Sequence, residues 1–203
     1  MRTFYLESLA NLELHNVDAE LVTYRGKPAM KLIEQDVMSD EQSIAILPDS
    51  NFKDGSIETE IAGSPRADAL MGMRGFVGIA FRVQPHGSIF ECFYLRPTNG
   101  RANDQLRRNH STQYISHPDY PWYKLREEYP GVYESYTDLV SGEWTKIKIV
   151  VSGIHAQLSV NGAEQPCLIV NDLKLDETEG EIAFWIGAGT EAYFSKVLVK
   201  PLE

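Results

Sequence analysis

Apolar and polar residues alternate along this chain in short runs that end at turn residues, and this pattern limits the fold more than any other property of the sequence. In residues 144–151, WTKIKIVV, two lysines alternate with two isoleucines. Such alternation is typical of an antiparallel strand with one face in the core and the other in water. Residues 154–162, IHAQLSVNG, alternate in the same way and end in Asn-Gly, a pair that favours a tight hairpin turn.

Similar strand-like runs recur along most of the chain. They are residues 43–48, 52–63, 74–84, 88–97, 143–153, 167–175, 180–189 and 192–201. No window offers a convincing long amphipathic helix, so the chain is predicted to be all-β, and many strands at close spacing favour a sandwich or a barrel. The 203 residues, 43% of them hydrophobic, are enough for a large core. We therefore expect a single domain over residues 1–203.

The balance of charge narrows the classes of partner. The formal net charge is −10, whereas a surface that binds nucleic acid or an anionic membrane needs a positive footprint. The N-terminal segment holds acidic side chains and no long apolar run, so it does not resemble a secretory signal, and no segment has the length of a membrane span. We expect a protein that binds neither nucleic acid nor membrane. It would be cytoplasmic as given, or secreted or periplasmic if a signal peptide has been removed.

Cysteines and histidines give no sign of a metal or redox centre. Cys92 and Cys167 both lie in apolar runs, where free buried thiols are common, so we predict two free thiols. None of the five histidines is spaced as HxH or HxxxH, and none has a cysteine beside it, which disfavours a zinc site. The motifs of serine hydrolases and of nucleotide-binding loops are missing too. We predict no metal and no cofactor.

Residues 97–136 stand apart as a long polar segment that is rich in aromatic residues and has no strand pattern. Six of the ten tyrosines, together with Trp122, lie between Tyr114 and Tyr136. Aromatic rings can stack on the apolar faces of a sugar, and planar polar groups can hydrogen-bond its hydroxyls. The segment is therefore predicted to be a functional loop that recognises saccharide. The alternative is that the rings cover the edge of the sandwich while nearby arginines pair with surplus acids.

A second candidate lies on the strand-like run 89–96, which carries a charge on each face. Glu91 points to one side of the strand and Arg96 to the other. Burying Glu91 among phenylalanines is costly unless it is paired, so we expect Arg82, on the preceding strand, to be its partner. Arg96 is expected to leave the strand end and begin the loop, which spares it burial. A carboxyl in an aromatic setting is also a candidate for a raised pKa, which makes Glu91 a candidate general acid.

Glu58 and Glu60 share one face of the strand-like run 57–61 and could supply the second carboxylate of a glycoside hydrolase. Retaining glycosidases hold their two carboxyls about 5–5.5 Å apart, and residues i and i+2 of a strand lie roughly 6–7 Å apart along the backbone. The alternative, which we favour, is an ordinary solvated strand face, because nothing nearby marks one carboxyl as the acid.

Several segments carry a resemblance to a known superfamily. They are FKDGSIETEI (52–61), GFVGIAFRV (75–83), FECFYLRP (90–97), GEWTKIKIVVSG (142–153) with VNG (160–162), and GEIAFWIG (180–187). In strand order the chain resembles the concanavalin A-like lectin/glucanase superfamily, and more narrowly its bacterial laminin-G-like and 3-keto-disaccharide-hydrolase-like domains. The resemblance implies a jelly-roll β-sandwich of two antiparallel sheets with a ligand groove on the concave face. The ExDxxE strand of laminarinase-like glycosidases and the paired calcium and manganese ligands of legume lectins have no counterpart in the sequence.

Residues and resemblance together predict a carbohydrate-recognising domain. The groove floor would consist of Arg82, Glu91, Tyr94 and Arg96, and the loop wall of Asp104, Gln105, Arg108, Tyr114 and Trp122. One alternative is a glycoside hydrolase or related sugar-acting hydrolase, with Glu91 as acid and Glu58 or Glu60 as partner, which requires both carboxyls in one cleft. A further alternative is a protein-interaction module or homodimer that docks through the aromatic loop, since Tyr, Trp and Arg are enriched at protein interfaces.

Overall fold

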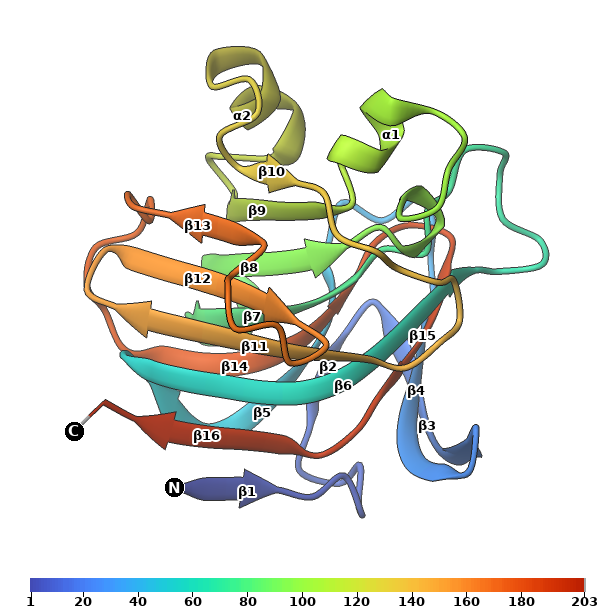
Figure 1. The fold of residues 1–203 in the computed structure, drawn as a ribbon. Coiled ribbons are helices and arrows are strands. Elements are labelled where there is room, and N and C mark those ends of the chain that lie inside the picture. The colour runs from blue at the N-terminus through green and yellow to red at the C-terminus, as the bar shows by residue number, and fades with distance from the viewer. Residues whose placement is uncertain (203) are drawn as a thin grey trace.

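Two antiparallel β-sheets packed face to face make up the protein, whose computed structural model describes residues 1–202 (Figure 1). The sheets have nine and seven strands and do not close into a barrel. The predicted jelly-roll β-sandwich, the architecture that the concanavalin A-like resemblance implied, is thereby confirmed. Runs with a period of two give each strand one apolar face, and two stacked sheets bury these faces against each other.

The nine-stranded sheet contains the first and the last strand of the chain. Its strands are β1 (Arg2–Phe4), β3 (Val17–Tyr24), β4 (Lys27–Glu34), β6 (Gly55–Pro65), β11 (Thr145–Ser152), β12 (His155–Val160), β13 (Leu168–Val170), β15 (Thr190–Phe194) and β16 (Val197–Pro201). The order is β13-β12-β11-β6-β15-β4-β3, with β16 also paired to β6 and β1 paired to β16. In β11, Lys146 and Lys148 are exposed while Ile147 and Ile149 are buried, as the alternation predicted.

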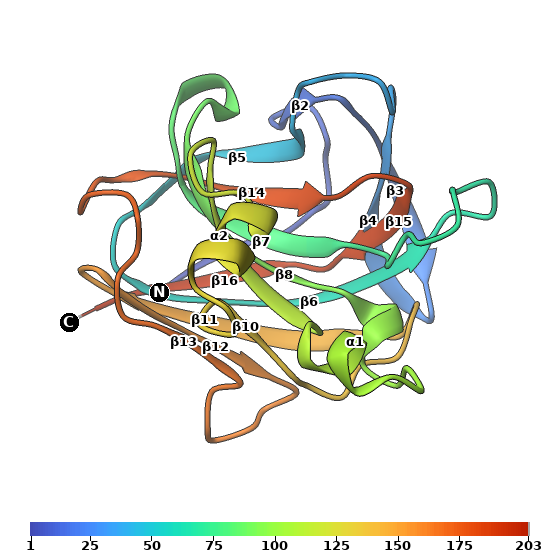
Figure 2. The same ribbon diagram turned by 90° about the horizontal axis from the view of Figure 1, so that it is seen from above.

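The seven-stranded sheet lies behind it. Its strands are β2 (Glu13–His15), β5 (Ser43–Phe52), β7 (Val77–Val83), β8 (Phe90–Leu95), β9 (Thr112–His117), β10 (Glu134–Ser135) and β14 (Gly180–Ile186). The order is β10-β9-β8-β7-β14-β5-β2. Seen from above, β5, β14, β7 and β8 form one layer and β6, β11 and β12 the other (Figure 2).

The core between the sheets is built by every second residue of the strands. Phe93 of β8, Ile79 of β7 and Phe184 of β14 are neighbours in register and are buried. Phe184 reaches Phe194 of β15 in the opposite sheet, with 5.0 Å between the ring centroids. Strand residues one position away must point to the outer face. This parity decides which side chains of the seven-stranded sheet can line a surface site.

Residues 97–136 are not the strandless loop that the sequence predicted. Besides β9 and β10 they contain η2 (Pro97–Asn99), α1 (Gln105–Asn109) and α2 (Trp122–Glu128), and β9 pairs with β8 along its whole length. The alternation of apolar and polar residues did not reveal strand β9, because polar residues occupy several of its buried positions. Gln113, for example, is fully buried, and its amide donates to the backbone oxygens of Tyr114 at 2.8 Å and Tyr133 at 3.2 Å. Polar side chains that are satisfied in this way can be buried, and they hide the apolar alternation.

Helices are short in this fold. Besides α1, α2 and η2, a 3-10 turn η1 (Pro85–Gly87) joins β7 to β8. Within residues 1–202, no helix has the length and apolarity needed to cross a membrane. Cys92 and Cys167 are both free thiols, as predicted.

Candidate functional site

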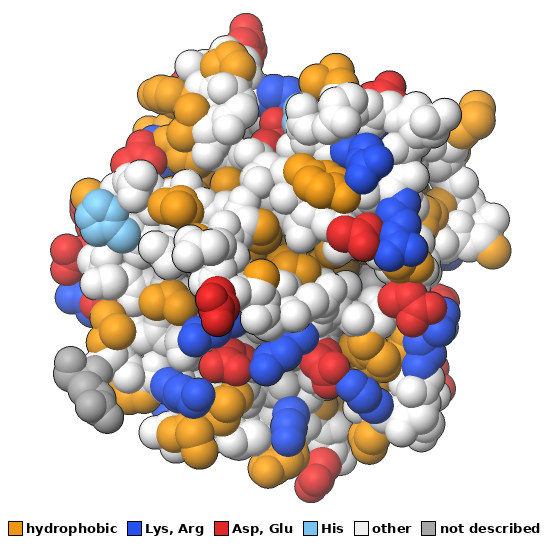
Figure 3. Space-filling model, in the orientation of Figure 1, with side chains coloured by type: hydrophobic (Ala, Val, Ile, Leu, Met, Phe, Trp, Pro, Cys, Tyr) orange, Lys and Arg blue, Asp and Glu red, His pale blue; other side chains and the backbone are white. Residues whose placement is uncertain are grey.

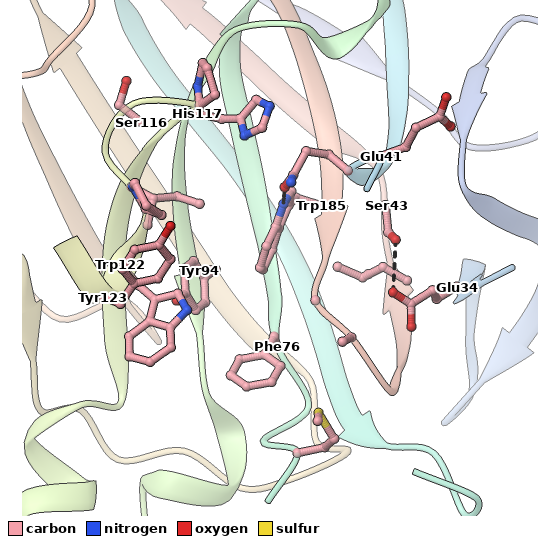
Figure 4. Close-up of a pocket in the computed structure, with 18 of the residues that line it drawn as sticks. Glu34, Glu41, Ser43, Phe76, Tyr94, Ser116, His117, Trp122, Tyr123 and Trp185 are labelled. Atoms are coloured by element: carbon pink, nitrogen blue, oxygen red, sulfur yellow. Dashed lines mark hydrogen bonds between the residues drawn. The ribbon is translucent and has the colours of Figure 1, made fainter. Parts of the chain in front are cut away.

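A groove of about 410 Å³ opens on the outer face of the seven-stranded sheet (Figure 4). Strand register sets its floor, because Tyr94 of β8 stands opposite Gly78 of β7, and Gly78 stands opposite Trp185 of β14. Since Phe93 and Phe184 face the core, Tyr94 and Trp185 face outward. Gly78 has no side chain, so the two rings meet above it with 4.7 Å between their centroids.

Gly78 is essential to this contact. A Cβ atom at position 78 would lie 2.5 Å from the Cβ of Tyr94, which is too close for either to stay in place. The indole Nε1 of Trp185 also donates to the amide oxygen of Gln42 at 3.2 Å. This bond ties the floor of the groove to the segment just before β5.

Aromatic rings form one wall of this groove, termed the aromatic groove, and polar side chains form the other. Trp122 and Tyr123, from the first turn of α2, are 43% and 61% exposed. Across from them lie Glu34, at the end of β4, and Ser43, the first residue of β5, while the carboxylate of Glu41, just before β5, is turned away from the rings (Figure 4). Phe76, just before β7, lies at one end of the groove. The walls therefore come from segments that are far apart in the sequence.

A buried ion network holds Trp122 in place. Glu134 of β10 accepts hydrogen bonds from Nη1 of Arg96 at 3.0 Å and from Nε of Arg126 at 2.8 Å. The guanidinium carbons of Arg96 and Arg126 lie 5.9 Å and 4.7 Å from the centre of the Trp122 ring, within the range of a cation–π interaction. The ring is thereby fixed while part of it stays exposed in the aromatic groove.

The charge state of this network follows from its contacts. Burial raises the pKa of Glu134, but the hydrogen bonds from Arg126 and the charge of Arg96 outweigh it, so the pKa lies below the usual 4.5. Glu134 is therefore an anion between two arginines at neutral pH. Arg96 also donates from Nη2 to the hydroxyl of Tyr94 at 2.8 Å. Because burial raises the pKa of Tyr94, this phenol of the floor stays neutral.

Hydrogen-bonding groups are concentrated opposite the rings and at the end of the groove away from Phe76. Glu34 accepts from the hydroxyl of Ser43 at 3.4 Å and from the backbone N–H of Gly189 at 3.2 Å (Figure 4). His117 stacks on Phe90 with 4.9 Å between the ring centroids. Burial lowers the pKa of His117 below 6.5, so at neutral pH it offers one donor and one acceptor.

Three of the predicted binding residues belong to this region. Tyr94 and Trp122 line the aromatic groove, and Arg96 contacts both of them. The prediction that Arg96 leaves the strand end and escapes burial is wrong, since only 5% of its side chain is exposed. Its charge can be buried because Glu134 neutralises it.

The predicted ion pair between Arg82 and Glu91 is not formed. Arg82 has a φ of +54° at an irregularity in the pairing of β7 with β14. Its guanidinium is fully buried and donates to Oδ1 of Asp54 at 3.2 Å and to the backbone oxygens of Lys53 at 3.1 Å and Gly153 at 2.8 Å. The irregularity breaks the alternation on which the pairing with Glu91 was predicted, and Arg82 does not reach the aromatic groove.

Glu91 lies inside the sandwich and not on a groove floor. Its carboxylate accepts hydrogen bonds from the hydroxyl of Tyr114 and from the backbone N–H of Leu175, the latter at 2.8 Å. Burial raises the pKa of Glu91, and the bonds from Tyr114 and Leu175 oppose this rise. The raised pKa expected of a general acid is present, but Glu91 is fully buried and does not line the aromatic groove. Its contacts fasten the segment before β14 to β8 and β9.

Glu58 and Glu60 lie on the outer face of the nine-stranded sheet. Glu60 pairs with Lys27 at 2.7 Å, and Glu58 lies 3.8 Å from Lys146. Figure 3 shows acidic and basic side chains interleaved across the lower half of this face. The structure thus places these carboxyls on one surface and Glu91 in the core, so the predicted catalytic pair does not share a cleft. The pairing of both carboxyls with lysines is what the solvated strand face favoured from the sequence would give.

The remaining predicted wall residues have other roles. Asp104 caps α1 by accepting a backbone hydrogen bond at 2.8 Å, and Gln105 bonds within the same helix at 2.7 Å. Arg108 donates to the hydroxyl of Tyr136 at 2.7 Å. Tyr114 is fully buried between the sheets. These four residues do not line the aromatic groove.

Several groove residues were missed by the sequence reasoning. Trp185 lies in the strand-like run 180–189 and was not singled out, although its position next to Phe184 could have shown that one of the two faces outward. Tyr123 was counted only as one of many aromatic residues in its segment. Glu34 and Glu41 carried no local signal, because only the packing of loops on the sheet brings them to the aromatic groove.

Comparison with known proteins finds similar folds among solved structures only. No family model and no curated protein matches the chain. Among solved structures it is similar to the carbohydrate-binding module CBM66 from Bacillus subtilis, with 12% identity and a TM-score of 0.60 over 92% of this chain and 94% of that one. A Bacillus subtilis protein of unknown function with a galectin-like fold is 14% identical, with a TM-score of 0.62 over 98% of this chain and 94% of that one. The lumenal domain of VIP36, in its Ca²⁺/Man3GlcNAc-bound form, is 9% identical, with a TM-score of 0.59 over 99% of this chain and 88% of that one.

Proposed function

We propose that the aromatic groove binds a saccharide and is the ligand groove that the concanavalin A-like resemblance implies. One observation carries the proposal. The exposed rings of Trp122 and Tyr123 stand across a groove of about 410 Å³ from the polar side chains of Glu34 and Ser43. Sugars have apolar C–H faces and hydroxyl edges, so a site that binds them needs both aromatic rings and hydrogen-bonding groups.

The two walls contribute to binding in different ways. Trp122 offers a ring that Arg96 and Arg126 hold in place, so little conformational entropy is lost when a ligand stacks on it. The carboxylate of Glu34 accepts hydrogen bonds from hydroxyls, and such charge-assisted bonds are roughly twice as strong as neutral ones. A ligand would lie with a ring face on the α2 side and its hydroxyls toward the loops before β5.

Two of the similar structures support saccharide as the ligand class. One is named a carbohydrate-binding module, and the other is VIP36 with Man3GlcNAc bound. Identities of 9% and 12% do not transfer a ligand from those proteins to this one. The chemistry of the aromatic groove therefore carries the proposal, and the shared fold adds to it.

A thermal-shift screen against a broad panel of mono- and oligosaccharides tests the proposal. A ligand at a hundred times its dissociation constant stabilises the folded state by about 2.7 kcal/mol. For a chain of this size that free energy corresponds to a rise in Tm of about 5–11 °C. We expect at least one saccharide in the panel to give a rise of this order.

Variants of the groove show where the sugar binds. Trp122→Ala should weaken binding about tenfold or more, because a stacked ring is worth about 0.5–1.5 kcal/mol beyond its buried area. Tyr5→Ala is the matched control, since Tyr5 is 63% exposed and lies outside the groove. Should Trp122→Ala fail to fold, Tyr123→Ala replaces it. A panel without any shift, or groove variants that bind as well as wild type, would contradict the proposal and favour the protein-docking alternative.

A further inference from the structure

A cluster of two histidines and one glutamate, the histidine cluster, lies at the edge of the seven-stranded sheet. Glu13 and His15 come from β2, and His86 comes from η1. Nε2 of His15 lies 2.8 Å from Oε1 of Glu13, and Nδ1 of His86 lies 3.0 Å from the same oxygen. The three atoms all lie within 4.8 Å of one another. Three metal-ligating atoms therefore converge on one point.

We propose that the histidine cluster binds a divalent transition-metal ion, with zinc as the best match. Two imidazoles and one carboxylate are a ligand set that zinc accepts, whereas calcium and magnesium prefer oxygen ligands alone. Zinc bonds of about 2.0–2.1 Å in tetrahedral geometry put two ligand atoms roughly 3.3 Å apart. The separations of 2.8 Å and 3.0 Å between the histidine nitrogens and Oε1 of Glu13 need to open by about 0.3–0.5 Å to admit the ion. The two histidine nitrogens lie within 4.8 Å of each other, so side-chain rotation can bring them to the same spacing.

The strands beneath the cluster hold its ligands in position. His15 pairs in register with Ile44 of β5, and Glu13 pairs with Ile46 of the same strand. Gly87, which follows His86, packs so closely on Ile44 that a Cβ atom there would collide with that side chain. Both ligand-bearing elements therefore rest on β5. The backbone that carries each ligand is thus fixed before an ion binds, which limits the conformational entropy lost to that of the side chains.

Space for the ion and for a further ligand lies next to the cluster. A hollow of about 270 Å³ is lined by His15, His86 and His117 together with Asp40 and Glu41. Three protein ligands leave the fourth position of a tetrahedral zinc site open to water or to another molecule. Because His117 and Glu41 also line the aromatic groove, that open position would lie at one end of the groove. Metal binding itself does not depend on the proposed saccharide function.

Sequence spacing could not reveal this site. Glu13 and His86 are 73 positions apart in the chain, whereas the spacing motifs of zinc sites place their ligands a few residues apart. The turn between β7 and β8 brings His86 beside β2, so the cluster exists only in the folded chain. The prediction that no metal binds rested on spacing alone.

Equilibrium dialysis and calorimetric titration with Zn²⁺ alone test the proposal. We expect one zinc ion per chain at micromolar free zinc, and Co²⁺ in its place should give the visible absorption of a tetrahedral site. His86→Ala should lower the zinc affinity at least about a hundredfold, since even the loss of an outer-shell partner costs about 10–100-fold. The side chain of His86 is 84% exposed, so this variant should fold normally.

Controls separate a metal site from a plain hydrogen-bonded cluster. His155→Ala removes an exposed histidine of β12 in the other sheet and should leave zinc binding unchanged. His15→Ala should lower the affinity as His86→Ala does. The proposal is overturned if wild type binds well under one equivalent of zinc at micromolar concentration. It is also overturned if His155→Ala lowers the affinity as much as His86→Ala, since zinc would then bind to surface histidines in general.

Discussion

Replacing Glu134 by glutamine should destabilise the protein by about 3–5 kcal/mol, because the change keeps the shape of the side chain and removes the charge that neutralises buried Arg96. The two side chains are 2% and 5% exposed and 3.0 Å apart, so water cannot replace the lost partner. Arg126 is 34% exposed and can turn toward solvent, so its lost pairing with Glu134 adds little to this destabilisation. For a chain of this size the loss corresponds to a fall in Tm of about 6–20 °C.

Urea denaturation at neutral pH measures this loss directly, with Glu60→Gln as the matched control. Glu60 also pairs with a cation, Lys27, at 2.7 Å, but the two side chains are 35% and 45% exposed. Exposed ion pairs contribute about 0.2–1 kcal/mol, so the control should lose at most that much. If Glu134→Gln loses no more than Glu60→Gln, the buried charge of Arg96 is not what makes Glu134 important.

The unfolding free energies of wild type and Glu134→Gln should depend differently on pH. The pKa of Glu134 in the folded state lies below its usual 4.5, so its stabilising charge is complete above about pH 4.5 and is lost as the pH falls through the folded-state value. The difference in unfolding free energy between wild type and Glu134→Gln should therefore be widest near neutral pH and should narrow in acid. A difference that is the same at both ends of this range would refute the electrostatic explanation.

Two further predictions concern the floor of the groove and the thiols. Gly78→Ala should cost about 1–3 kcal/mol through overpacking and change tryptophan fluorescence, because its Cβ would push Tyr94 away from Trp185; unchanged fluorescence and Tm would contradict this. Burial raises the pKa of Cys92 far above its usual value and that of Cys167 to about 11. Ellman's reagent should therefore react slowly with Cys167 and not with Cys92 until urea unfolds the chain, and two fast thiols in the native protein would refute the burial.

Much of the architecture could be predicted from the sequence, because strands follow from a local pattern. The alternation around Ile147 and Ile149 predicted a half-solvated antiparallel strand, and β11 is one. The same rule failed for β9, since buried Gln113 is satisfied partly by distant residues, donating to the backbone oxygen of Tyr133 and accepting from Arg96. It also failed at Arg82, where a positive φ breaks the period of two.

The sequence predicted a site of aromatic rings beside polar groups, and it named only some of the residues that line the aromatic groove. Tyr94 and Trp122 were named from the sequence and do line the aromatic groove. Glu91 was named because it is a charge among aromatic residues, but it points into the core and bonds to Tyr114. A local pattern shows that a residue is unusual, yet the reason can be a buried hydrogen bond as well as a ligand.

The sequence by itself indicated most of the strands after residue 42, several of the turns and, from these, an all-β sandwich or barrel, because each of these depends on residues within a few positions of one another. Tertiary structure alone decided which charges pair. In the folded chain Arg96 pairs with Glu134, and Arg82 pairs with Asp54. Tertiary structure also set the register that brings Trp185 beside Tyr94, and it placed His86 next to β2. These contacts join residues far apart in the chain, so they follow from strand pairing and packing, which no short stretch of sequence contains.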